Sequence, residues 1–78
     1  MIRELDTVVL THDLAEKGLQ QGDLGAVVHC HPQSQAYEVE FVTAEGETVA
    51  LLTLTPKDIR PVQSRDMLHV RELLPACA

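Results

Sequence analysis

The residues best suited to metal chemistry are consecutive, as His29-Cys30-His31. In an extended strand, alternate side chains point to opposite faces, so His29 and His31 would share one face and Cys30 would occupy the other. A structural zinc site needs four protein ligands, so His12 or His69 would have to complete the set. The pattern favours two exposed histidines around a small buried thiol and predicts no metal site. A metal-binding protein that uses His29 and His31 is the alternative.

Two pairs of carboxylates, Glu38/Glu40 and Glu45/Glu47, are the candidates for acid–base chemistry. Such chemistry needs two carboxylates that converge on a pocket with different pKa values. Glu38 and Glu40 instead alternate with apolar residues over positions 37–41, which is typical of the solvated face of a strand. No serine or cysteine lies in a strand-to-helix elbow, and no glycine-rich phosphate loop leads into a helix. The sequence therefore predicts a protein that is not an enzyme, with no catalytic residues and no cofactor.

The charge of the chain is acidic and unevenly distributed. The net charge is −6 at pH 7 for 78 residues. Residues 1–56 carry two bases against nine acids, whereas residues 57–78 carry four bases against three acids. The acidic part would repel a phosphate backbone and attract a basic partner, so we do not expect nucleic acid as a ligand. An accessory nucleic-acid binder of KOW type is the further alternative, although it would need a basic, aromatic-rich face.

Length and composition indicate one small domain with a single core. No apolar run approaches the length of about 20 residues that a membrane span requires, and the acidic N-terminus does not resemble a secretory signal. We therefore expect a cytoplasmic protein that does not contact membranes. Cys30 and Cys77 are too few for a disulfide framework, so both thiols are expected to be reduced.

Hydrophobic patterning predicts a β protein. Short β-branched or alternating runs separated by glycine and proline indicate strands near residues 7–11, 26–31, 36–43, 48–55 and 59–62. Gly22 and Gly25 bracket a turn that needs a positive φ or a close backbone approach. Pro56-Lys57-Asp58 is expected to form one 3₁₀ turn before the last strand. This layout predicts a small, five-stranded, all-β SH3-like barrel over residues 1–62, with a C-terminal tail over 63–78.

The alternation within these strands predicts which side chains fill the core. They are Val8, Leu10, Leu24, Val28, Cys30, Tyr37, Val39, Phe41, Val49, Leu51, Leu54 and Ile59.

The tail can be read in two ways. Met67, Val70 and Leu74 fit the spacing of a helix, whereas residues 68–71 fit a short strand with Leu68 and Val70 inward. We expect an extended tail that packs on the barrel or on a partner, with a docked helix as the alternative. His69 and Arg71 would share one face of the extended form. The basic character of the tail contrasts with the acidic barrel, so these two residues are candidate contact residues.

Four blocks resemble, in order and spacing, the short bacterial proteins grouped as domain-of-unknown-function family 4926. They are residues 5–11 (LDTVVLT), 22–28 (GDLGAVV), 36–42 (AYEVEFV) and 49–54 (VALLTL). The resemblance runs through Val62 and into residues 69–73. The family's name assigns no activity. What the resemblance implies is an association with small two-gene modules of toxin and antitoxin type, and hence a protein partner.

Together these features predict a non-enzymatic protein-interaction module, antitoxin-like or accessory in a two-gene pair. The partner would be another protein or a second copy of the chain. The candidate binding residues are His69 and Arg71 on the tail and the acidic pair Glu38 and Glu40 on the barrel.

Overall fold

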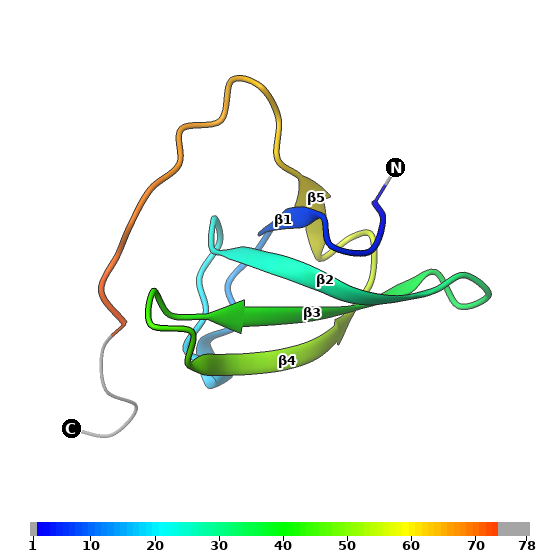
Figure 1. Ribbon diagram of the computed structural model, residues 1–78, viewed down its shortest axis with the longest axis horizontal. Helices are drawn as coiled ribbons and strands as arrows, with labels where there is room; N and C mark the ends of the chain where they lie inside the picture. The colour runs from blue at the N-terminus through cyan, green and yellow to red at the C-terminus, as the bar shows by residue number, and fades with distance from the viewer. Residues whose placement is uncertain (1, 74–78) are drawn as a thin grey trace.

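The computed structural model describes residues 2–73 and is almost entirely β (Figure 1). Its strands are β1 (Thr7–Leu10), β2 (Leu24–His31), β3 (Ala36–Val42), β4 (Thr48–Leu54) and β5 (Ile59–Pro61). One short 3₁₀ helix, η1 (Ala15–Lys17), lies in the loop between β1 and β2. All five predicted strands are present. β2 begins two residues earlier than predicted, and the other strands each end one residue earlier.

The strands form one antiparallel sheet in the order β4-β3-β2-β1-β5. Each neighbouring pair is antiparallel. Among the described residues no ladder joins β4 to β5, so both strands are edges and the sheet is not closed. The all-β, five-stranded prediction is therefore confirmed, whereas the SH3-like barrel is not.

The two glycines before and within β2 have the roles that the sequence predicted. Gly22 has a φ of 96°, a left-handed conformation that favours glycine. A Cβ atom on Gly25 would lie 2.5 Å from Cγ1 of Val39 and 2.9 Å from Cε2 of Phe41. Gly25 therefore lets β2 approach β3 and the core closely.

The core lies on one face of the sheet and includes most of the predicted residues. Its fully buried members include Val8, Leu10, Val39 and Ile59, and Cys30, Tyr37 and Val49 pack partly buried against them. Three predicted core residues are exposed instead. The exposed fractions are 37% for Leu24, 43% for Val28 and 57% for Leu51.

Two irregularities in strand pairing explain two of these wrong predictions. The register between β2 and β3 shifts between Val27 and His29, so Val27 points inward and Val28 is the extra, exposed residue. A second shift between β3 and β4 leaves Val49 as the extra residue. Counted back from the buried Leu54, every second side chain of β4 then points inward, so Leu51 faces outward.

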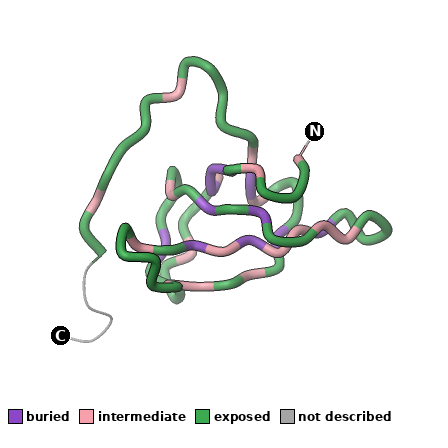
Figure 2. The backbone as a smooth tube through the Cα atoms, in the orientation of Figure 1, coloured by how far each residue is buried: buried purple, intermediate pink, exposed green. Residues whose placement is uncertain are grey.

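The chain after β5 forms a segment that we call the strap, residues 63–73. It has neither helix nor strand and arcs away from the sheet before it returns towards the β3–β4 end (Figure 1). Figure 2 shows most of its length as exposed. Residues 63–73 thus contain neither the helix nor the short strand that the sequence suggests for the tail, and Leu68 and Val70 are exposed. The rest of the predicted tail, 74–78 with Leu74 and Cys77, lies outside the described residues. None of the described residues belongs to a helix long and apolar enough to cross a membrane.

Candidate functional site

The strap is fixed to the sheet at two points by arginine–aspartate pairs. At its start, Nη1 and Nη2 of Arg60 donate to Oδ2 and Oδ1 of Asp66 over 2.9 and 3.1 Å. Near its end, Nε and Nη2 of Arg71 donate to Oδ1 and Oδ2 of Asp23 over 2.9 and 2.7 Å. Arg71 also donates to the carbonyl of Gly18 over 3.0 Å. Two parallel hydrogen bonds per pair fix the orientation of each arginine as well as its distance.

Asp23 is held by the turn that leads into β2. Its side chain accepts a hydrogen bond from the backbone N–H of Gln20 at 2.8 Å, and its own N–H donates to the carbonyl of Gln20. The carbonyl of Asp23 accepts from the N–H of Leu10 on β1. The hydrogen bond from Arg71 lowers the pKa of the Asp23 carboxyl, and the same bond raises the pKa of Arg71. The carboxylate is therefore preformed to receive the strap.

Between the two anchors the strap presents large apolar side chains to solvent. Met67 and Val70 are each 91% exposed and Leu68 is 71% exposed. None of the three belongs to the core cluster of the described residues or packs against it. Three apolar side chains within four residues are a recognised mark of an interaction surface when they lie together on a folded protein.

Two pockets, of about 370 and 310 Å³, both include Asp23 and Arg71 among their lining residues. His69 and Leu24 line both pockets. Met67 and Leu68 border the first pocket, and Val70 and Leu73 border the second. The strap and the start of β2 therefore line both pockets, and the exposed apolar side chains of the strap are part of that lining.

The structure places the four predicted binding residues in two separate regions. His69 and Arg71 lie together on the strap, and Arg71 serves there as an anchor within the chain. Glu38 and Glu40 lie on β3 and are among the lining residues of neither pocket.

Both β3 carboxylates are bound within the sheet. Glu38 accepts hydrogen bonds from Nε2 of His31 at 2.7 Å and from Oγ1 of Thr53 at 3.3 Å. Glu40 accepts one from Oγ1 of Thr48 at 2.7 Å. The bond from His31 lowers the pKa of Glu38. These side chains stabilise the pairing of β3 with its neighbours and are less available to a partner than the sequence predicts.

His29 and His31 share one face of β2, as predicted, with ring centroids 4.6 Å apart in an edge-on arrangement. His31 contacts Glu38, and Nδ1 of His29 lies 3.5 Å from Oε2 of Glu4. Cys30 is half-buried on the other face. Within residues 2–73 no three His, Cys, Asp or Glu side chains are arranged to hold a metal ion.

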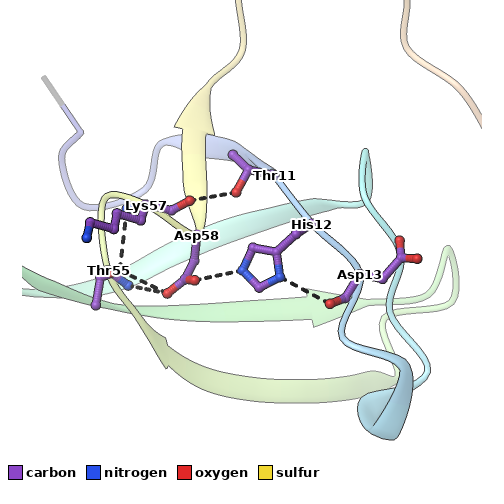
Figure 3. A network of polar contacts seen from close by, with 6 residues as sticks. All are labelled: Thr11, His12, Asp13, Thr55, Lys57 and Asp58. Atoms are coloured by element: carbon purple, nitrogen blue, oxygen red, sulfur yellow. Dashed lines mark hydrogen bonds and ion pairs between the residues drawn. The ribbon is translucent and has the colours of Figure 1, made fainter.

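One polar cluster was not identified from the sequence. Nε2 of His12 lies 2.7 Å from Oδ1 of Asp58, and Nδ1 lies 3.1 Å from the carbonyl oxygen of Asp13 (Figure 3). The other oxygen of Asp58 accepts from the backbone N–H and the hydroxyl of Thr55 at 2.9 and 3.0 Å. The hydroxyl of Thr11 donates to the carbonyl of Lys57 at 2.7 Å. The cluster thus joins the end of β1 to the turn before β5.

The His12–Asp58 pair resembles the base and orienting carboxylate of a hydrolase, but its geometry indicates a structural role. A catalytic base needs one ring nitrogen free to face a nucleophile. Both nitrogens of His12 already face oxygen atoms of the chain. The hydrogen bond with Asp58 is the main reason why the pKa of His12 is raised and that of Asp58 is lowered. Sequence spacing could not find this pair, because its members are 46 residues apart.

Comparison with known proteins places the chain in a family. The family model described as a domain of unknown function, DUF4926, matches residues 4–61. The chain belongs to this family. The match confirms the resemblance seen in the sequence, and it spans all five strands of the DUF4926 sheet. The strap follows the matched residues. Neither the curated proteins nor the solved structures include a significant match to this chain.

Proposed function

We propose that this DUF4926 protein is a non-enzymatic interaction module that binds a partner protein through the strap. The observation that supports this most directly is the exposure of Met67, Leu68 and Val70 between two anchored points. In the proposed setting the protein is the accessory or antitoxin-like member of a bacterial two-gene pair and acts in the cytoplasm. We also propose that the five strands form an SH3-like fold, because their order and the short turn before β5 are compatible with that small binding domain.

Burial of the strap supplies a sufficient driving force for association. Removing a large aliphatic side chain from water contributes about 1.5–3 kcal/mol when burial is complete. Met67, Leu68 and Val70 are almost fully available for this gain. The anchors at Asp66 and Arg71 hold the segment before binding, so less conformational entropy is lost when a partner covers it.

The acidic sheet suits a partner with a basic rim. Residues 1–56 hold nine of the twelve acidic side chains and only two of the six basic ones. Charges at the rim of an interface mainly accelerate encounter, while a desolvated apolar centre holds the complex. We therefore expect an apolar pocket on the partner, surrounded by lysine or arginine.

The test compares two double variants in calorimetric titrations with the purified product of the neighbouring gene. Met67→Ser with Val70→Ser removes the apolar surface of the strap, and we expect at least about a hundredfold weaker binding. Leu5→Ser with Val28→Ser is the matched control, because both residues are exposed and neither lines the two pockets beside the strap. The control should bind as the wild type does. Equal binding by the two double variants would contradict the strap as the contact surface, and no binding by the wild type would contradict the two-gene assignment.

A further inference from the structure

The two edges of the sheet differ in how they are protected. An edge strand offers unpaired N–H and C=O groups, and proteins commonly protect such edges with short strands, proline or charged side chains. β5 is three residues long and ends at Pro61. β4 is seven residues long and contains neither a charged residue nor a proline. β4 is therefore the unprotected edge.

The outer side of β4 has no partner within the described part of the chain. Backbone hydrogen bonds outside the strand ladders involve none of the residues 48–54. The side-chain hydrogen bonds of β4 run towards β3, from Thr48 to Glu40 and from Thr53 to Glu38. Leu51, at the centre of the strand, is 57% exposed. This edge has the length and composition that strand addition requires.

We propose that a second copy of this chain pairs with it antiparallel along β4, with Leu52 opposite Leu52 of the second copy. Residues paired across an antiparallel ladder point to the same face, so inward residues must meet inward residues. Pairing about Leu52 satisfies this rule over residues 50–54, because Ala50 meets Leu54 and Leu51 meets Thr53. Pairing about Leu51 or Ala50 would bring the irregular residue Val49 into the ladder.

The charges at the two ends of β4 favour a second copy as the occupant. Glu45 and Glu47 precede the strand, and Lys57 follows it in the turn before β5. Antiparallel pairing brings the Glu47 end of each copy beside the Lys57 end of the other. Neither Glu47 nor Lys57 forms an ion pair within residues 2–73. Two such contacts would offset part of the repulsion between copies that each carry a net charge of −6.

One strand pair forms a small interface, below about 1,200 Å² in total, so we expect a weak and rapidly exchanging dimer. Sedimentation velocity of the wild type between about 10 µM and 1 mM should show the mean mass rise from that of one chain towards that of two. A wild type that stays monomeric over this range would overturn the proposal.

The decisive variant is Leu51→Lys, with Val42→Lys as its matched control. Both residues are exposed outward, at 57% and 51%, and both changes add one positive charge. Only Leu51 lies on the edge strand, where each lysine would lie opposite Thr53 of the other copy and place a charge in the new ladder, a common way for proteins to prevent edge pairing. We expect Leu51→Lys to weaken the dimer by at least about tenfold and Val42→Lys to leave it unchanged. Equal weakening by both, or by neither, would overturn the proposal.

A charge reversal tests the register with residues outside the strand. Glu47→Lys and Lys57→Glu should each weaken the dimer, and the double variant should restore it, because the two charges meet again with their signs exchanged. Failure of the double variant to restore association would contradict pairing about Leu52. The strap variant Met67→Ser with Val70→Ser should dimerise as the wild type does, which separates this inference from the proposed partner site.

Discussion

At the scale of single residues, His12 shows how one imidazole can join distant parts of a small fold. Its ring lies between the Asp58 carboxylate and the Asp13 carbonyl. Only the protonated ring donates a hydrogen bond from both nitrogens, so the protonated form satisfies both acceptors. Asp58 also accepts two hydrogen bonds from Thr55, at the start of the turn before β5. The cluster therefore depends on the charge states of two groups.

The sign of the pH dependence follows from these two pKa shifts. The pKa of His12 is raised in the folded state, so its contribution to stability is complete below the unfolded value, near pH 6.5, and is lost as the pH rises through the folded value. The pKa of Asp58 is lowered, so its contribution is lost as the pH falls through its folded value. The pair stabilises the fold most between these two limits.

We therefore predict that His12→Gln lowers the thermal midpoint at about pH 5.5 more than at about pH 8.5. The reason is that the His12 ring of the wild type carries its proton, and so forms the charged pair, at the lower pH. Thermal melts of both proteins across this range would measure the difference. His69→Gln is a suitable control, since His69 has no side-chain hydrogen bond within residues 2–73 and its loss should not reproduce the effect. A pH-independent loss in His12→Gln would contradict a charged pair.

Gly25 provides a second residue-scale prediction. Gly25→Ala would place a methyl group 2.5 Å from Val39 and 2.9 Å from Phe41, both fully or almost fully buried. Overpacking of this kind destabilises by about 1–3 kcal/mol. Urea unfolding would measure the change, with Ala26→Ser on the exposed face of the same strand as the control. A loss below about 0.5 kcal/mol, the usual range for a surface substitution, would show that β2 moves away without strain.

At the scale of elements, the strands could be predicted from sequence more reliably than the faces that they bury. The alternation of residues 37–41 identified the inward side of β3 correctly. The apolar runs of β2 and β4 have no comparable alternation, and the irregular residues Val28 and Val49 change the phase within each strand. A bulge is a property of the pairing between two strands, so it cannot be predicted from the residues of either strand alone.

The strap supplies the prediction at this scale. Asp23→Asn should release its C-terminal anchor, because the amide removes the charge that Arg71 binds while it preserves the size of the side chain. We expect faster amide exchange over residues 68–73 and a loss of about 1 kcal/mol in the free energy of unfolding, since the pair is partly exposed. Glu16→Gln, an exposed acid on η1, is the control. Unchanged exchange in the strap would contradict this anchoring.

The candidate site illustrates the limit of sequence reasoning at the same scale. His69 and Arg71 were selected because the basic tail contrasts with the acidic sheet, and both lie on the strap. The exposure of Met67, Leu68 and Val70 was not predicted, since apolar residues in a small protein are first assigned to its core. The sequence did contain one indication of this exposure, because the five strands and the loop between β1 and β2 alone supply the apolar side chains of the buried core cluster.

At the scale of the whole molecule, the sheet and the strap contribute to stability in different ways, and salt should affect the two contributions differently. Among the described residues, the buried core cluster runs from Val8 to Ile59, and the DUF4926 match covers residues 4–61. The strap adds ion pairs rather than apolar burial, and salt screens partly exposed pairs. The fold should thus survive without the strap, while the strap's contribution should depend on ionic strength.

Truncation after Val62 tests this division. The shortened chain should keep the circular dichroism spectrum of a β protein, and at about 10 mM salt it should be less stable than the full chain, because both anchors are lost. At about 500 mM salt the difference in stability between the two chains should shrink, because salt then screens the two arginine–aspartate pairs of the full chain. A loss that is equal at both salt concentrations would show that the strap stabilises the sheet by apolar packing. Loss of the β spectrum would show that the sheet requires the residues that follow it.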